Sequence, residues 1–175
     1  MADATGSTSY GYDNRDRLVS KATPFGTLAY TYDAAGNALT LTSSNVGGAA
    51  TTYGYDALNR LASVTDASGV TTYSDDAIGN LAGYAYPNGV STSYTYDPLN
   101  RLTNMQSNCG TSAGCGVPGT AIAGYGYTLG AAGNRLSVAE LSGRTVTYGY
   151  DDLYRLTSEN VSGDPGGKNG VVSYQ

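Results

Sequence analysis

Pairs of opposite charge recur along the chain at a fixed spacing of four residues. An aspartate stands four positions before an arginine in several places, among them Asp56 and Arg60, Asp97 and Arg101, and Asp151 and Arg155. Such a pair is either a repeated polar site or part of a turn, in which the carboxylate accepts backbone N–H groups two or three residues further on. The turn is favoured, because an exposed ion pair contributes only about 0–1 kcal/mol.

Other residue types that carry out chemistry are scarce. The chain has no histidine, which removes the commonest general base and the commonest metal ligand. Asp75 and Asp76 are adjacent, but successive strand residues point to opposite faces and are poorly placed to share a cation. No cluster supplies the six or more oxygens that Ca²⁺ takes. We therefore expect no catalytic residue, no metal site and no cofactor, and an enzyme is the least favoured class.

The two cysteines, Cys109 and Cys115, lie in a segment at residues 103–124 that we expect to be an irregular insert. The five residues between them are all small, so a local disulfide is feasible in an oxidising compartment. A disulfide-closed loop is favoured over free thiols. Both are favoured over a nucleophile, because a catalytic cysteine would want a histidine beside it.

The composition narrows the possible partners. The net charge is −5 and the sequence pI about 4.4, which disfavours nucleic acid, whose phosphates require a basic face. No apolar run approaches the ~18–20 residues that span a bilayer. The chain contains 17 tyrosines, one phenylalanine and no tryptophan, and tyrosine can bury a large ring while its hydroxyl stays satisfied at a surface.

Most of the tyrosines belong to one phrase that recurs seven times, with a period of about twenty residues. It reads Tyr-x-Tyr-Asp, then a turn-like stretch, then Arg or Asn and usually Leu, and its copies begin at Tyr10, Tyr30, Tyr53, Tyr73, Tyr94, Tyr125 and Tyr148. An eighth copy begins at Tyr174. Repeats of this kind are the mark of quasi-one-dimensional proteins, in which each unit packs on its neighbours.

Each slot of the phrase has a physical interpretation. Rings at positions i and i+2 of a strand point to the same face, and the residues between them, Thr, Ser or Gly, point to the other. The aspartate then starts a turn, and three residues later stands Asp, Gly or Asn, which tolerate the positive φ of a type I turn followed by a bulge. The repeat-defining structural residues are Tyr10, Tyr12, Asp13, Tyr30, Tyr32, Asp33, Tyr53, Tyr55, Asp56, Arg60, Tyr94, Tyr96, Asp97, Arg101, Tyr125, Tyr127, Tyr148, Tyr150, Asp151 and Arg155.

The pattern predicts one β-hairpin per copy and an all-β fold. Consecutive hairpins would form a twisted, curved antiparallel strip, because a lone hairpin is marginally stable in water and must pack beside its neighbours. We expect residues 1–175 to be a single array of about seven such hairpins, interrupted by the cysteine-containing insert.

At the level of G-x-x-x-x-Y-x-Y-D-x-x-[GN]-[NR]-L, the sequence resembles the RHS or YD-repeat family. The resemblance rests on segments such as 53–61, 69–73 and 86–89, and it covers nearly the whole chain. In that family the repeats form a β-strip that spirals into a hollow shell, found in bacterial polymorphic toxins, in the cocoon of insecticidal toxin complexes and in the barrel of teneurins. The shell commonly encloses a toxic C-terminal domain. Seven copies are few for closing such a cavity, and the end segment with paired catalytic aspartates of self-cleaving shells has no counterpart here.

The resemblance implies a structural, non-catalytic protein or fragment, secreted or at the bacterial cell surface, that forms part of a β-shell or scaffold. Its expected partners are further YD repeats of the same chain or copies of itself, head to tail, with an enclosed toxin domain or surface glycans beyond them. Two alternatives stay open. One is a self-assembling extracellular fibre whose subunits stack through open β edges. The other is a carbohydrate-binding or adhesive module that uses exposed tyrosine, Asn and Asp side chains.

Overall fold

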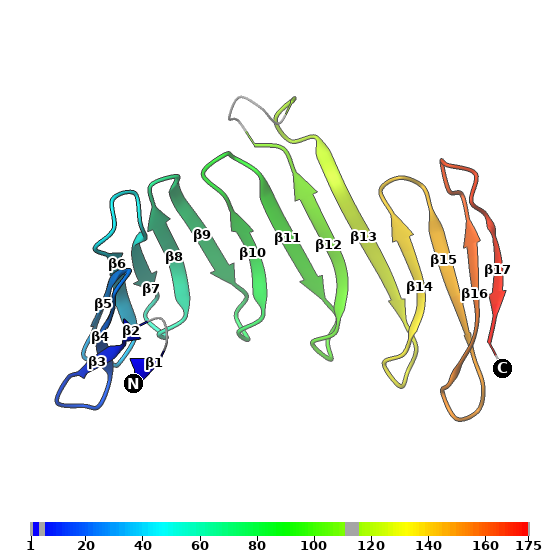
Figure 1. Cartoon of the computed structure of the whole chain (residues 1–175). Coiled ribbons are helices and arrows are strands. Elements are labelled where there is room, and N and C mark those ends of the chain that lie inside the picture. Colours follow the sequence, from blue (N-terminus) through cyan, green and yellow to red (C-terminus); the bar gives the residue numbers. More distant parts are fainter. Residues whose placement is uncertain (1, 4–5, 111–115, 175) are drawn as a thin grey trace. The chain divides into compact units, whose positions relative to one another are not determined.

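The computed structural model describes residues 2–3, 6–110 and 116–174. Every regular element among them is a β-strand, and within each sheet strands that follow one another are neighbours (Figure 1). The predicted all-β fold of consecutive hairpins is therefore confirmed. The chain divides into two compact units, Met1–Tyr73 and Ser74–Gln175. That residues 1–175 form a single repeat array stays a prediction.

The first unit begins with a two-stranded pair and continues as a sheet in which chain order equals spatial order. The strands are β1 (Ala2–Asp3), β2 (Gly6–Ser7), β3 (Ser9–Tyr12), β4 (Leu18–Thr23), β5 (Gly26–Tyr32), β6 (Ala38–Ser43), β7 (Ala50–Tyr55) and β8 (Leu61–Asp66), with β9 (Gly69–Asp75) running across the unit boundary.

The second unit follows the same order. Its strands are β10 (Leu81–Ala85), β11 (Ser91–Tyr96), β12 (Leu102–Asn108), β13 (Ala121–Leu129), β14 (Arg135–Glu140), β15 (Thr145–Tyr150), β16 (Leu156–Ser162) and β17 (Gly170–Ser173). In both units the odd-numbered strands from β3 onward carry the first part of the phrase and are called outgoing strands. The even-numbered strands from β4 onward are called return strands.

In the second and fifth copies the two tyrosines of the phrase lie on the same, less exposed face of their strand. In β5, Tyr30 and Tyr32 are half-buried while Thr31 between them is exposed, and Tyr94, Thr95 and Tyr96 repeat this alternation in β11. This arrangement confirms the prediction from the Tyr-x-Tyr spacing, because side chains two residues apart share a face of a strand.

In six copies of the phrase the turn contains a β-bulge. The register shifts by one residue at the end of the outgoing strand, so that the facing pairs there are Tyr12–Leu18, Tyr32–Ala38, Tyr55–Leu61, Tyr96–Leu102, Leu129–Arg135 and Tyr150–Leu156. The fourth turn residue has positive φ, between 59° and 104°, at Asp16, Gly36, Asn59, Gly79, Asn100, Gly133 and Tyr154. The predicted turn with its bulge is confirmed. Tyr154 was not expected, because a bulky residue rarely adopts this conformation.

The hydrophobic core is thin. Among the described residues only three hydrophobic residues are buried, Cys109, Val138 and Val146, together with the polar Thr92. Val138 faces Val146 across β14 and β15. A single sheet leaves both faces partly open to solvent, so the links between neighbouring hairpins must supply much of the stability.

The segment expected to be irregular is shorter than residues 103–124. β12 continues to Asn108 and β13 begins at Ala121, and the two strands pair from Asn104 opposite Gly126 onward. The strands extend because Thr103 and the residues after it can continue the ladder of hydrogen bonds. Residues 103–108 and 121–124 of the predicted insert are therefore strand.

Candidate functional site

The aspartate of each phrase organises its own turn. In the fifth copy the Asp97 N–H donates to the Arg101 carbonyl at 2.9 Å. Its Oδ1 accepts the N–H groups of Leu99 and Arg101, at 2.9 and 3.0 Å, and its Oδ2 accepts Arg101 Nε at 2.6 Å. The arginine Nε repeats this bond to the aspartate in the first, third and seventh copies, at Asp13, Asp56 and Asp151. The Asp–Arg pair therefore closes a turn, as favoured from the sequence.

These hydrogen bonds keep the aspartates ionised. The backbone N–H of Arg101 is the largest cause that holds the pKa of Asp97 below its ordinary value of 3.8, and the matching arginine N–H does the same for the pKa of Asp13, Asp56 and Asp151. In the second copy the Asn37 amide is the main cause of the lowered pKa of Asp33. Carboxylates held in this form accept hydrogen bonds and have no proton to donate at neutral pH.

The arginine or asparagine that follows the turn also reaches forward to the next copy. Arg17 Nη1 donates to the Asp33 carbonyl at 2.9 Å, and Arg101 Nη1 donates to the Gly130 carbonyl at 2.8 Å. Where the slot holds asparagine, the amide bonds the next turn instead: Asn37 to Asn59 at 3.0 Å, and Asn80 to Asn100 at 3.3 Å. One side chain thus closes its own turn and holds the following turn in register.

The second tyrosine of a phrase reaches back to the preceding copy. Its hydroxyl donates to the carbonyl at the start of the preceding return strand: Tyr32 to Leu18, Tyr55 to Ala38, Tyr96 to Leu81 and Tyr150 to Arg135, at 2.7 to 2.9 Å. In the fourth copy Asp75 occupies this slot and supplies no phenol. The forward and backward bonds together form a two-way link between neighbouring hairpins.

Arginine side chains also form cation–π contacts with tyrosine rings. The Arg17 guanidinium lies 4.6 Å from the centre of the Tyr32 ring, and that of Arg135 lies 5.3 Å from the Tyr127 ring and 5.9 Å from the Tyr148 ring. A cation over an aromatic ring contributes on the order of 0.5–1 kcal/mol at exposed positions. The contacts of Arg17 with Tyr32 and of Arg135 with Tyr148 run between copies, and they reinforce the link.

The predicted site residues are brought together within turns and between adjacent copies, not in one shared cleft. Tyr10 and Tyr12 in the edge strand β3 are exposed. Cys109 is only 2% exposed and is disulfide-bonded. Its expected partner, Cys115, lies outside the described residues, so the pairing stays a prediction. Among the described residues no group of three or more His, Cys, Asp or Glu side chains could hold a metal ion.

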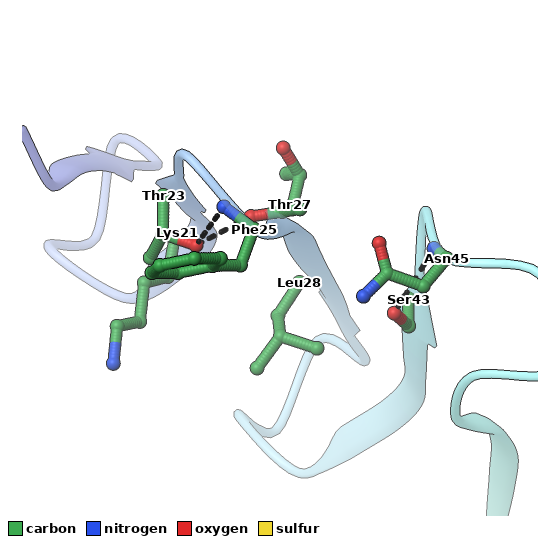
Figure 2. Close-up of a pocket in the computed structure, with 8 residues that line it drawn as sticks. Lys21, Thr23, Phe25, Thr27, Leu28, Ser43 and Asn45 are labelled. Carbon is green, nitrogen blue, oxygen red and sulfur yellow. Dashed lines mark hydrogen bonds between the residues drawn. The ribbon is translucent and has the colours of Figure 1, made fainter. Parts of the chain in front are cut away.

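The sequence did not reveal which partners the tyrosine hydroxyls and arginines would find, since these lie about twenty residues away. It also did not reveal a hollow at the other end of the hairpins in the first unit, lined by Lys21, Thr23, Phe25, Gly26, Thr27, Leu28, Ser43 and Asn45 (Figure 2). The one available signal was that the only phenylalanine stands in a turn, next to Pro24. In the described part of the chain no helix has the length and apolar character needed to cross a membrane.

The structure defines a protein built of tandem, linked β-hairpins. The family model described as RHS Repeat matches residues 32–71 and 76–108. The resemblance predicted from the sequence is confirmed: the chain carries RHS, or YD, repeats. No match was found among curated protein sequences.

Solved structures share this fold. A crystal structure of TcdB2-TccC3-TEV superposes with a TM-score of 0.74 at 19% identity, covering 90% of this chain and 9% of that one. The Photorhabdus luminescens Tc holotoxin pore, with a mutated TccC3, gives 0.66 at 22% identity, covering 77% and 7%. A crystal structure of TcdB2-TccC3 gives 0.62 at 17% identity, covering 98% and 12%. The chain therefore spans about a tenth of the length of these similar proteins.

Proposed function

We propose that the chain is a segment of a non-catalytic YD-repeat shell or scaffold, whose partners are further YD repeats. The observation that carries the proposal is the two-way link, since it can extend the array from any copy to the next. At the outermost copies the linking groups are uncovered. The Arg155 side chain is 74% exposed, whereas that of Arg101, which reaches the next turn, is 28% exposed. Tyr12, at the opposite edge, is 60% exposed.

The similar structures support the larger context of this proposal. They belong to Tc toxin proteins many times longer than this chain, so a shell of which this chain is one stretch is the consistent interpretation. An enclosed toxin domain, a bacterial source and a secreted or cell-surface location are part of the proposal. Fractionation of the producing cells, with detection of the chain by antibody, tests the location: recovery only in the cytoplasmic fraction would contradict it.

The proposal assigns no catalytic role. The carboxylates of the phrase are occupied as hydrogen-bond acceptors within their turns, and the chain has no histidine to act as a general base near neutral pH. In this proposal the side chains of the repeat therefore have a structural role.

An extension of the array tests the proposal directly. The eighth copy begins at Tyr174, and an appended Tyr-Asp-Ala-Leu-Asn-Arg-Leu segment with a following return strand would complete it. We expect the Tm to rise by a few degrees, because each added repeat contributes a new interface. An extension with Phe in place of the appended tyrosine keeps the hairpin but loses the hydroxyl link, and is expected to raise the Tm less. If neither extension raises the Tm, the linking groups do not recruit further repeats.

The fibre alternative, in which subunits stack through open β edges, predicts a different assembly from the shell segment. Electron microscopy of the purified chain separates the alternatives: discrete particles are expected, and long filaments would favour the fibre.

A further inference from the structure

A small hollow at the connector end of the first unit has the composition of a sugar site. It has a volume of about 190 Å³ and lies between the β4–β5 turn and the connector that follows β6. Phe25 stands at the tip of the β4–β5 turn and is 74% exposed. Figure 2 shows Phe25 on one side of the hollow, Ser43 and Asn45 on the other, and Leu28 between them. An exposed aromatic ring beside a polar wall is an unusual use of the only phenylalanine in the chain.

The two walls are held in place by hydrogen bonds between them. The Ser44 N–H donates to the Thr27 carbonyl at 2.9 Å, and the Thr27 N–H donates to Ser44 Oγ at 2.8 Å. Within the aromatic wall, Thr23 Oγ1 accepts the Phe25 N–H at 3.2 Å and donates to the Gly26 carbonyl at 3.0 Å. The ring and the opposite wall therefore keep their spacing before any ligand arrives, which lowers the entropy cost of binding.

Gly26 allows the two walls of the hollow to lie close to each other. Gly26 has a φ of +136°, and a Cβ atom on it would lie 2.3 Å from Asn45 Oδ1. The Asn45 carboxamide accordingly lies against the turn that carries Phe25, and in Figure 2 it points toward Leu28. A side chain at residue 26 would displace it and alter the hollow.

The polar groups that line the hollow are open to a ligand. Within the described part of the chain, Lys21 forms no ion pair and the Asn45 carboxamide has no hydrogen-bond partner. The hydrogen bonds of Asn45 come from its backbone: its N–H donates to Ser43 Oγ at 3.2 Å, and its carbonyl accepts the Gly48 N–H at 2.9 Å. The Lys21 side chain extends past the Phe25 ring (Figure 2). The hollow thus offers an aromatic face, an ammonium group, and an amide that both donates and accepts.

We propose that this hollow binds a pyranose sugar that carries a carboxylate, such as a hexuronic acid residue of a glycan. The apolar C–H face of the sugar would stack on Phe25, the Asn45 carboxamide would bond its hydroxyls, and the ammonium group of Lys21 would attract the carboxylate. Neutral apolar ligands leave the amide and the ammonium unused, and a bare anion leaves the ring unused. The site adds a ligand to the structural role proposed above and does not depend on that role.

Titration of the whole chain with glucuronate and with glucose, followed by NMR chemical-shift changes, tests the proposal. We expect weak, saturable shifts of Phe25, Thr27 and Asn45 with glucuronate at millimolar concentration, and weaker binding of glucose. Phe25→Ala is expected to reduce the affinity roughly tenfold. Tyr154→Ala, which removes another exposed aromatic side chain far along the sequence, is the matched control and should bind as the parent chain does.

Lys21→Gln separates the charge from the stacking. We expect it to abolish the preference for glucuronate over glucose while glucose binding is unchanged, and we expect the preference of the parent chain to fall as salt is added. Three results would each overturn the proposal. These are no shift with either sugar at tens of millimolar, equal binding of the two sugars by the parent chain, and undiminished binding by Phe25→Ala. Folding of each variant is checked by its Tm, and little change is expected because Phe25 is largely exposed.

Discussion

The two ends of the hairpins follow different rules. The turn edge, which carries the Asp turns, repeats one geometry, and three of its glycines, Gly36, Gly79 and Gly133, have positive φ with open space, free of atoms to 4 Å, where a Cβ would lie. The connector edge, where one copy passes to the next, contains Gly110, on which a Cβ atom would lie 1.7 Å from the Gly89 carbonyl oxygen. Gly36, Gly79 and Gly133 are therefore needed for their backbone conformation, whereas Gly110 is needed because a side chain there has no space.

The turn edge has the same structure in each copy of the repeat, whereas the connector edge differs from copy to copy. The turn edge is stabilised by hydrogen bonds within each turn and by links to neighbouring copies. The fourth turn residue can therefore be Asp, Gly or Asn, which all tolerate its positive φ. The connector edge varies in length and holds its own contacts, among them the disulfide-bonded Cys109 and the hollow beside Phe25. A repeat protein can place individual binding features on such an edge without disturbing the repeated one.

Acidification should destabilise the folded chain more than any of the substitutions below, because six carboxylates of the turn edge are protonated over the same pH range. The pKa is lowered in the folded chain at Asp13, Asp33, Asp56, Asp76, Asp97 and Asp151. The unfolded chain therefore takes up protons first, so the stabilisation is present above the ordinary value of 3.8 and is lost as the pH falls through the lower folded values. Thermal unfolding followed by circular dichroism from pH 7 to pH 2 is expected to show a steep fall in Tm below about pH 4. A flat profile would contradict the role of these turns.

Substitution of a connector glycine should be the most damaging single change. Gly110→Ala places a methyl group where the Gly89 carbonyl oxygen lies, and backbone atoms cannot move aside as a flexible side chain can. We expect a loss of about 3 kcal/mol in the free energy of unfolding, measured by urea denaturation. The matched change at the turn edge, Gly133→Asn, should cost less than about 0.5 kcal/mol, since Asn59 and Asn100 fill the same slot in other copies. Equal losses would remove the distinction between the edges.

Removal of one backward link should have an intermediate effect. Tyr96→Phe keeps the ring but removes the hydroxyl that donates to the Leu81 carbonyl at 2.9 Å. We expect a loss of about 1 kcal/mol in the free energy of unfolding. Tyr12→Phe is the control, because Tyr12 occupies the same slot in the edge strand β3 and its hydroxyl has no such partner among the described residues. A similar loss in both variants would show that the link contributes nothing.

A substitution in the turn of the seventh copy should stabilise the folded chain. Tyr154 has a φ of 59°, in the left-handed region where a bulky residue is strained, and its side chain is 62% exposed. Tyr154→Asn should raise the free energy of unfolding by about 0.5–1 kcal/mol, because Asn tolerates this conformation at lower cost. The reverse change, Asn100→Tyr in the fifth copy, should lower it by a similar amount. Calorimetry of both variants gives the comparison, and a destabilising Tyr154→Asn would show that the ring makes a contact that matters.

Much of the fold could be read from local patterns. Spacing placed Tyr30 and Tyr32 on one face of a strand, and Asp33 with Gly36 located the turn, because these effects involve residues within one hairpin. The partners of Tyr32 and Arg17 could not be read in this way, since they belong to the neighbouring copy and their choice depends on strand register. The position of Tyr154 was missed because the residue type contradicts the conformation that the turn imposes.

The order of residues alone decides that this chain is β-sheet, that it reverses at each aspartate, and that every copy repeats the one before, since these follow from side-chain alternation and turn chemistry. Only the folded sheet decides which carbonyl each tyrosine hydroxyl meets and which two connectors enclose the hollow beside Phe25. The reason is that strand pairing brings together groups about twenty residues apart, and no local preference specifies the side chains that then come into contact.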